Sequence, residues 1–241
     1  MEKASQNLIK DLKKQKKEGN NLLFLDNIKI IKDAIKKGLK PQFIFVENEE
    51  LNFDCLCQIY KVDRKTIEQL SDSKTPQGVV CVAEYIPNIV KKPKDNFLVL
   101  DTIQDPGNAG SLIRTACACG FETVFMLDSV RVTNSKLVRS SVGTVFDINI
   151  YEMKKQEFID KNKTWKLNLI KADMNGENVF EAKFSSPVGV VVGNEGQGVS
   201  KELSQICTSS VKIPMTNKVE SLNAGISGSI IMYQINKKRL S

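Results

Sequence analysis

Three polar segments that contain glycine carry the residue types able to do chemistry in this chain. The first contains Asn108 and Arg114, the second contains Glu195, and the third contains Ser221 and Asn223. An arginine on an otherwise apolar helix is either a salt-bridged structural residue or a cation directed at a phosphate or a ribose. A carboxylate in a glycine-rich turn is either solvated, paired with that arginine, or turned toward a cationic ligand.

The chain contains no histidine among its 241 residues. This absence excludes a Ser-His-Asp triad, a Cys-His pair and an imidazole metal ligand. A general base that works near neutral pH would have to be a carboxylate, a lysine, a tyrosine, a cysteine or an unusual arginine.

The first segment covers residues 101–114 and follows a predicted strand. Pro106-Gly107 is typical of a turn, and Asn108 is expected to cap a helix over residues 109–119. Six positions separate this cap from the arginine on the same helix, which is less than two helical turns.

The second segment covers residues 190–200, where a predicted strand runs straight into the pattern G-N-E-G-x-G. A helix is expected to begin at Ser200 or Lys201. The spacing differs from the dinucleotide fingerprint G-x-G-x-x-G, and Glu195 would repel a pyrophosphate. These two features disfavour a nucleotide-dependent oxidoreductase.

The third segment covers residues 213–229 and leads into a helix expected over residues 222–238. Either Ser221 or Asn223 is expected to cap this helix. The small residues that follow permit close approach of a second backbone. That approach would serve packing against another helix or a dimer interface equally well.

Four short apolar runs predict the strands that position these segments. They lie at residues 97–100, 123–127, 165–170 and 187–192, and helical stretches separate them. Nearly continuous apolar strands are typical of a parallel sheet buried on both faces. Ligands of such sheets bind beyond the carboxyl ends of the strands, which is where the polar segments begin.

The N-terminal third predicts a smaller α/β unit. Helices are expected at residues 3–17 and 28–37, and strands at residues 43–46 and 78–83. Residues 85–96 carry two prolines and several lysines, and are interpreted as a linker between domains 1–84 and 97–241.

Net charge and cysteine content indicate the kind of partner and the cellular compartment to expect. The net charge of +7 favours an anionic partner, with nucleic acid first, although lysine-rich composition alone would also produce it. The six cysteines form no C-x-x-C pair, so buried reduced thiols and a cytoplasmic location are expected. The sequence has no apolar signal core and no run long enough to cross a membrane.

In this order and spacing, the three segments resemble the motifs of the SpoU (TrmH) family of RNA ribose 2′-O-methyltransferases, within the SPOUT superfamily. Residues 105–116 with Gly120-Phe121 resemble the first family motif, residues 192–200 the second, and residues 213–215 with 221–223 the third. Residues 138–146 match a further family segment. The resemblance is close over residues 97–241 and looser over residues 1–84.

The resemblance implies an α/β fold with a parallel sheet and a deep trefoil knot in the C-terminal SPOUT domain, and a small N-terminal α/β domain that binds substrate RNA. It implies S-adenosyl-L-methionine as cofactor, a homodimer with sites near the interface, and rRNA, or else tRNA, as the partner. The positions that match the family's cofactor contacts are Gly193, Asn194, Ile213, Met215 and Leu222. The positions that match its catalytic residues are Arg114, Asn108, Glu195, Ser221 and Asn223.

Within that resemblance each residue type has an expected role. Arg114 would activate the ribose hydroxyl, and electrostatic stabilisation is favoured over proton acceptance because guanidinium holds its proton so strongly. Glu195 would orient Arg114 or attract the sulfonium, and Asn108 and Asn223 would hydrogen-bond the ribose or the knot loops. No metal is needed for this chemistry.

One alternative remains open on this scaffold. The family usually has a Val-Ser pair after Ser-Leu-Asn, whereas this chain has Ala224-Gly225. Together with the net positive charge, this departure is compatible with an RNA-binding protein that has no catalytic activity. The presence of all five residues that match the catalytic positions argues against it.

Overall fold

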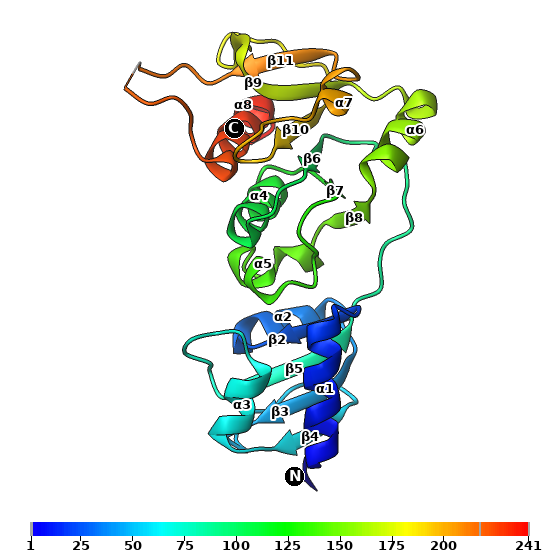
Figure 1. The fold of residues 1–241 in the computed structure, drawn as a ribbon, viewed down its shortest axis with the longest axis vertical. Helices are drawn as coiled ribbons and strands as arrows, with labels where there is room; N and C mark the ends of the chain where they lie inside the picture. Colours follow the sequence, from blue (N-terminus) through cyan, green and yellow to red (C-terminus); the bar gives the residue numbers. More distant parts are fainter. Residues whose placement is uncertain (1, 217, 241) are drawn as a thin grey trace.

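The computed structural model describes residues 2–216 and 218–240, which form two open sheets joined by one extended segment. Figure 1 shows the two sheets stacked along the long axis of the molecule, with the N-terminal sheet at the bottom. Residues 85–96 run between them without a helix or a strand. Pro87 and Pro93 lie in this stretch, and proline has no backbone N–H with which to join a sheet.

The N-terminal sheet has five strands in the order β1-β4-β3-β5-β2, and β5 runs antiparallel to both its neighbours. Successive side chains on a strand point to opposite faces, so Phe45 packs under α1 and α3 while Ile44 and Val46 pack under α2. The unit is therefore a three-layer sandwich. Its elements are β1 (Glu2–Lys3), α1 (Gln6–Glu18), β2 (Leu22–Leu25), α2 (Ile28–Lys36), β3 (Pro41–Val46), β4 (Gln58–Lys61), α3 (Arg64–Leu70) and β5 (Val79–Glu84).

Most of the elements expected in this third of the chain are present. The helix expected at residues 28–37 is α2, and the strands expected at 43–46 and 78–83 are β3 and β5. The first helix begins later than expected, because Ser5 caps it by accepting a hydrogen bond from the Leu8 N–H at 3.2 Å. Strands β2 and β4 were not expected, since each has only four residues.

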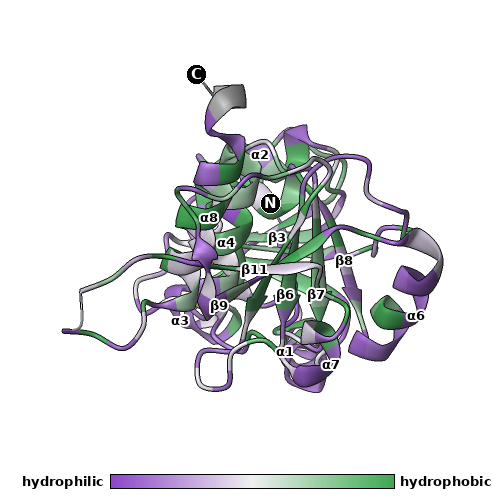
Figure 2. Ribbon diagram, turned by 90° about the horizontal axis from the view of Figure 1, so that it is seen from above, coloured by the Kyte–Doolittle hydropathy of each residue, from purple (hydrophilic) through white to green (hydrophobic). Residues whose placement is uncertain are grey.

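The C-terminal sheet has six strands, all parallel, in the order β11-β9-β10-β6-β7-β8. Helices α4, α5 and α8 pack on one face, and α6 and α7 on the other. Figure 2 shows the hydrophobic colour concentrated on the central strands between these helix layers. The elements are β6 (Phe97–Asp101), α4 (Pro106–Ala118), β7 (Thr123–Leu127), α5 (Ser135–Ser140), η1 (Thr144–Phe146), β8 (Asn149–Met153), α6 (Lys155–Trp165), β9 (Leu169–Asn178), β10 (Gly189–Gly193), α7 (Lys201–Ser204), β11 (Ser209–Lys212) and α8 (Ala224–Leu240).

The parallel sheet confirms the expected α/β class, and one expected strand needs correction. The run at residues 165–170 is not one strand, because Trp165 ends α6 and β9 begins only at Leu169. The Trp165 ring instead packs against Phe125, with ring centroids 6.1 Å apart, in the core below the sheet. Apolar content alone does not separate the buried end of a helix from a strand.

One hydrophobic cluster continues from α2 of the N-terminal unit to α4 and α8 of the C-terminal unit. Polar contacts join the two units around it. Arg139 donates to both carboxylate oxygens of buried Asp26, at 2.9 and 3.1 Å, and Lys37 pairs with Asp147 at 2.7 Å. The two units are thus held in a fixed arrangement by apolar packing and by ion pairs.

The six cysteines are all free thiols. Cys81 and Cys119 are buried, as expected, whereas Cys55, Cys57, Cys117 and Cys207 are only half-buried. Across residues 2–216 and 218–240, no helix has both the length and the apolar character that a membrane span requires.

Candidate active site

The carboxyl ends of β6 and β10 lie side by side at the centre of the C-terminal sheet, with Asp101 opposite Gly193. The chain order reverses here, because β6 has β7 on one side and β10 on the other. Such a switch point is where open α/β sheets form their binding crevice. Two hydrogen bonds tie the loops together: Asn194 Nδ2 donates to the Thr102 carbonyl at 3.0 Å, and the Ser200 N–H donates to Asp101 Oδ2 at 2.7 Å.

The loop after β10 closes on itself tightly. A Cβ atom on Gly193 would overlap the backbone of Gly198 and Val199, so only glycine fits at that position. The Gly198 N–H donates to the Asn194 carbonyl at 2.8 Å, and Asn194 Oδ1 accepts from the Gly196 N–H at 2.9 Å. The Asn194 side chain is therefore committed to holding the loop, and its expected contact with a cofactor remains a prediction.

Helix α4 begins earlier than the sequence pattern indicated. Asp105, not Asn108, is the N-cap, and its Oδ1 accepts a hydrogen bond from the Asn108 N–H at 2.8 Å. Pro106 then occupies the first helical turn, where its missing N–H costs nothing. This hydrogen bond and the nearby Lys136 ammonium, whose Nζ lies 3.0 Å from Asp105 Oδ2, lower the pKa of the Asp105 carboxyl.

Moving the cap to Asp105 leaves the Asn108 side chain free to join two distant segments. Its Nδ2 donates to Glu195 Oε1 at 2.7 Å, and its Oδ1 accepts from Asn223 Nδ2 at 2.9 Å. Three of the five residues expected to be catalytic thus form one hydrogen-bonded chain, although they lie as far as 115 positions apart in sequence.

Helix α8 completes this arrangement from the opposite side. Asn223 is its cap, since Asn223 Oδ1 accepts from the Gly225 N–H at 2.8 Å and from the Ile226 N–H at 3.3 Å. The helices approach closely because a Cβ on Gly228 would overlap Leu112 of α4. Gly228 therefore serves packing against α4, which is one of the two purposes that the sequence left open for the small residues of α8.

The carboxylate at the end of the hydrogen-bonded chain is the reactive feature of the arrangement. Glu195 is exposed, and only its Oε1 has a hydrogen-bond partner within the described ranges. Its second oxygen is available to accept a hydrogen bond from a hydroxyl group or to attract a cation. The Asn108 amide holds the carboxylate in one orientation, as a positioned acceptor requires.

Arg114 is not part of the hydrogen-bonded group formed by Glu195, Asn108 and Asn223. It is exposed and forms no hydrogen bond or ion pair with any residue that the structure describes. Of the two roles expected for Glu195, pairing with Arg114 is not seen among the described residues of one subunit, and attraction of the sulfonium stays a prediction. The reason is helical geometry, since six residues turn the helix through about one and two-thirds turns and place Arg114 about a third of a turn away from Asn108.

The remaining expected residues lie on the loop between β11 and α8. Ser221 is exposed, and its hydroxyl has no hydrogen-bond partner in the described parts of the chain. Ile213, Met215 and Leu222 are half-buried, and Ile213 packs against the hydrophobic core. Leu222 directly precedes Asn223 in the sequence and places an apolar side chain beside that end of the hydrogen-bonded residues.

Sequence reasoning missed two residues that shape the site. Lys136 reaches the N-terminus of α4 from α5, a contact that no local pattern indicates. Thr102 has a positive φ of 59° and presents its carbonyl to Asn194, although threonine rarely adopts this conformation. The polar loop in which Thr102 lies was recognised, but its backbone strain left no signal in the sequence.

Comparisons with known proteins identify the family and the fold. The family model described as "SpoU rRNA Methylase family" matches residues 95–233. The 23S rRNA (guanosine(2553)-2′-O)-methyltransferase RlmP of Bacillus subtilis is 28% identical over 98% of this chain and 98% of its own length. An uncharacterized tRNA/rRNA methyltransferase of Synechocystis is 30% identical over 75% of this chain and 68% of its own length.

Solved structures share the fold along the whole chain. The AdoMet-bound rRNA methyltransferase from Sinorhizobium meliloti has a TM-score of 0.86 at 23% identity, covering 100% of this chain and 98% of that one. The SpoU methyltransferase AviRb from Streptomyces viridochromogenes, in complex with AdoMet, has a TM-score of 0.85 at 21% identity, covering 98% of this chain and 99% of that one. Because the family model matches more than half of the residues, the chain belongs to the SpoU rRNA methylase family of RNA methyltransferases.

Proposed function

We propose that this protein transfers a methyl group from S-adenosyl-L-methionine to a ribose 2′-hydroxyl of rRNA, with tRNA as the second candidate substrate. The observation that carries the proposal is the hydrogen-bonded chain from Glu195 through Asn108 to Asn223. It brings residues from all three family motifs to the carboxyl ends of β6 and β10. The Bacillus subtilis relative, named as a 23S rRNA 2′-O-methyltransferase, supports the choice of rRNA.

The residue types expected to contact the cofactor fit its chemistry. S-adenosyl-L-methionine, when bound, supplies a methyl group on a positively charged sulfur. The half-buried side chains of Ile213, Met215 and Leu222 provide apolar surface for an adenine ring, and the tight turn at Gly193 exposes loop backbone for hydrogen bonding. The exposed carboxylate of Glu195 would attract the sulfonium charge.

The chain's own residues would position the acceptor. Transfer forms a bond between the ribose oxygen and the methyl carbon, breaks the carbon–sulfur bond with its electron pair left on sulfur, and passes the hydroxyl proton to water. Glu195 Oε2 would accept a hydrogen bond from that hydroxyl, while Asn108 keeps the carboxylate in place. Ser221 and Asn223 would bind the ribose or the adjoining backbone. Positioning of this kind can remove about 7–11 kcal/mol of barrier.

Arg114 is proposed to act as a stabiliser of negative charge across a homodimer interface. It has no partner among the described residues of its own subunit, and it lies about a third of a turn from Asn108 around α4. The neighbouring helix α8 exposes two large apolar side chains, Ile226 at 54% and Tyr233 at 50%. A second copy of the chain packed on this side would bury both.

Further parts of the proposal concern the whole chain. Residues 1–84 would bind RNA, residues 85–96 would act as linker, and residues 97–241 would carry the methyltransferase. The segment from β10 to α8 would form a deep trefoil knot, as the family resemblance implies. A crystal structure of the protein tests the threading. The protein would act in the cytoplasm.

The main test is methylation of bulk rRNA and tRNA with cofactor carrying a labelled methyl group. Label should enter rRNA at ribose 2′-oxygens, and Glu195→Gln should reduce the rate about 10²–10³-fold by removing the carboxylate. Calorimetric titration with the cofactor is the companion measurement. Cofactor binding without label transfer to either RNA would contradict the proposal, and absence of both would favour the RNA-binding alternative.

Mixed dimers test the role of Arg114. If Arg114 serves the partner's site, a dimer of one Arg114→Ala subunit and one Glu195→Gln subunit retains one intact site. Random mixing of these two inactive variants should then restore about a quarter of wild-type activity, because half of the dimers are mixed and each has one working site. No restoration on mixing, with dimers demonstrated by light scattering, would place Arg114 in its own subunit's site.

A further inference from the structure

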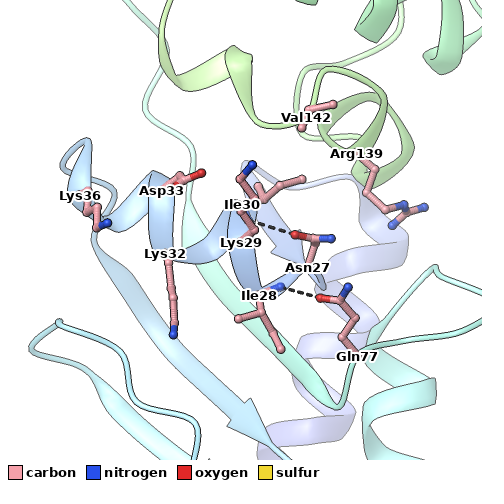
Figure 3. Close-up of a pocket in the computed structure, with 10 residues that line it drawn as sticks. All are labelled: Asn27, Ile28, Lys29, Ile30, Lys32, Asp33, Lys36, Gln77, Arg139 and Val142. Carbon is pink, nitrogen blue, oxygen red and sulfur yellow. Dashed lines mark hydrogen bonds between the residues drawn. The ribbon is translucent and has the colours of Figure 1, made fainter.

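A cavity of about 900 Å³ lies between the two units, away from the hydrogen-bonded chain of the candidate site. Helix α2 forms one wall, and the end of α5 with the turn that follows it forms another. Figure 3 shows Lys29, Lys32 and Lys36 along α2, and Arg139 and Val142 on the part of the C-terminal unit that lies beside this helix. The cavity opens to solvent on the α2 side, where these lysines are exposed.

The three lysines form a cationic edge whose charge is largely uncompensated. Positions i, i+3 and i+7 fall on one face of a helix, and the first and last are about 10 Å apart along its axis. Lys29 and Lys36 have no ion pair within residues 2–216 and 218–240, and Lys32 contacts only the Phe53 ring, 5.9 Å away. Asp33 is the single carboxylate that lines the cavity.

A second cavity between the two units, of about 580 Å³, provides the contrast. Three of its four basic residues are used inside the protein. Within the N-terminal unit, Lys16 pairs with Asp72 at 2.8 Å and Lys13 donates to Gln69 at 3.2 Å. Arg131 joins the two units by donating to the Gly19 carbonyl at 2.5 Å, whereas the lysines of α2 have no ion pair within the described ranges.

Two amide groups in the first cavity are fixed as donors. Gln77 Oε1 accepts from the Ile28 N–H at 2.9 Å, and Asn27 Oδ1 accepts from the Ile30 N–H at 3.1 Å. Both oxygens are engaged at the start of α2, so each NH₂ group remains as a donor without a partner in the described ranges (Figure 3). Lysine ammonium groups are donors too. The cavity therefore selects an occupant that is negatively charged and rich in acceptors.

Val142 adds an apolar surface beside these donors. It is 44% exposed and has a positive φ of 53°, a conformation that a β-branched residue rarely adopts. The left-handed conformation closes the end of α5, where the Gly143 N–H donates to the Val138 carbonyl at 3.1 Å, and it leaves the Val142 side chain at the surface of the cavity. An unstacked nucleobase would cover it while its phosphates contact the lysines.

We propose that this cavity holds a single-stranded segment of the substrate RNA, with its phosphates along Lys29, Lys32 and Lys36 and one base on Val142. The proposal rests on the proposed function and adds where the RNA lies. The lysine edge spans more than one phosphate, which favours a chain over a free anion. A duplex would keep its bases stacked and away from Val142.

Helix α5 connects this cavity to the candidate site. Arg139 lines the cavity, and Lys136, one turn earlier on the same helix, contacts Asp105 at the start of α4. Asp105 in turn holds the backbone of Asn108. RNA bound in the cavity would therefore lie beside the element that positions the catalytic chain, as a segment flanking the target nucleotide must.

The test compares two triple variants of the full-length protein. Lys29→Gln, Lys32→Gln and Lys36→Gln removes the cationic edge, and Lys10→Gln, Lys14→Gln and Lys17→Gln on α1 removes the same charge from another exposed surface. Binding of a single-stranded RNA oligomer is measured by fluorescence anisotropy over a range of KCl concentrations. Thermal melts of both variants, expected to match wild type, verify folding.

We expect the α2 variant to bind the oligomer at least about tenfold more weakly and to lose about 2 from the slope of log K against log salt, since each phosphate contact contributes about 0.7. The α1 variant should lose little of either. In methylation assays the α2 variant should raise KM for RNA and leave kcat unchanged. Equal losses in both variants, or none in the α2 variant, would overturn the proposal.

Two further measurements distinguish a bound RNA segment from a bound small anion. Val142→Gly suits the positive φ, and it should weaken oligomer binding severalfold without changing the salt slope; unchanged affinity overturns the base contact. Inorganic phosphate and a nucleoside monophosphate at 10-fold excess over the oligomer should not displace it, and displacement would indicate a small-anion site instead. Cofactor titration of the α2 variant should match wild type, so a failure here is distinct from a failure of the methyltransferase proposal.

Discussion

At the scale of single residues, the orientation of one amide organises the candidate site. Asn108 presents its NH₂ group to Glu195 and its oxygen to Asn223, and neither contact survives if the amide is reversed. Asn223 cannot rotate to compensate, because its own oxygen caps α8. The direction of every hydrogen bond in the chain is therefore set by the cap of a helix.

Asn108→Asp should disable the site while leaving its shape unchanged. The substitution replaces the donor at 2.7 Å from Glu195 with a carboxylate oxygen, so two negative charges would meet. We expect kcat to fall about 10²–10³-fold at pH 8. Since two adjacent carboxylates raise the pKa of one of them, protonation should restore part of the activity as pH falls toward 5.

The measurement is a kcat profile against pH for Asn108→Asp, wild type and the control Ser111→Ala. Ser111 lies exposed on the same helix and forms no hydrogen bond within the part of the chain that the structure describes. A wild-type kcat in Asn108→Asp, or a loss that does not depend on pH, would contradict the role given to this amide.

At the scale of elements, the start of α4 carries more than a helix cap. Asp105 accepts the hydrogen bond from the Asn108 N–H and also attracts Lys136 of α5. One side chain thus starts the helix, fixes the backbone of the site residue and joins two helices. Gly110 allows that junction, because a Cβ there would lie 2.6 Å from the Leu137 carbonyl.

Asp105→Ala should destabilise the protein by about 1 kcal/mol at pH 7, the usual effect of losing an N-cap. The pKa of Asp105 is lowered in the folded state, first by the Asn108 N–H and then by Lys136. A carboxyl with a lowered pKa contributes its stability above the unfolded value of about 4, and that stability is lost as pH falls through the folded value.

Urea unfolding of wild type and Asp105→Ala at pH 7 and pH 3 measures this effect. The difference between their midpoints should be present at pH 7 and should shrink at pH 3, where the wild-type carboxyl approaches protonation. Asp105→Asn, which keeps a capping oxygen but no charge, should fall between the two. A difference that grows toward low pH would contradict the assigned cause.

At the scale of the whole molecule, a buried ion pair fixes the two units against each other. The Asp26 side chain is 3% exposed and accepts from Arg139 and, at 2.6 Å, from the Ser71 hydroxyl. Arg139 is 29% exposed, so the arginine can still reach water if its partner is lost. The buried Asp26 carboxylate cannot reach water in the same way. Losing Arg139 should therefore destabilise the protein more than losing Asp26.

Arg139→Ala should cost about 3 kcal/mol of unfolding free energy, because it leaves a buried carboxylate with one hydroxyl partner. Asp26→Asn should cost less, since the freed guanidinium can be solvated. Lys37→Ala is the matched control, for it removes the other ion pair between the units, in which both side chains are about a third exposed, and should cost less than about 1 kcal/mol. Urea midpoints rank the three variants, and equal costs for Arg139→Ala and Lys37→Ala would show that burial does not matter here.

Sequence patterns predicted the parts of this fold whose signal is local. Apolar runs gave β6, β7 and β10 within a residue or two at each end, because strands of a parallel sheet are buried on both faces. The polar edge strand β11 was missed because few apolar residues mark it, and β2 and β4 were missed because each has only four residues. Trp165 was placed in a strand because apolar content does not reveal which element carries it.

The sequence by itself determined the family, the fold class and which residues to suspect, because motif residues are recognised by type and order. Tertiary structure alone decided how those residues are combined. It joined Asn108 to Glu195 and Asn223, separated Arg114 from them, and brought the lysines of α2 opposite Val142. The physical reason is that a helix fixes the direction of each side chain by its turn angle, while the partner that meets it comes from a distant strand or helix.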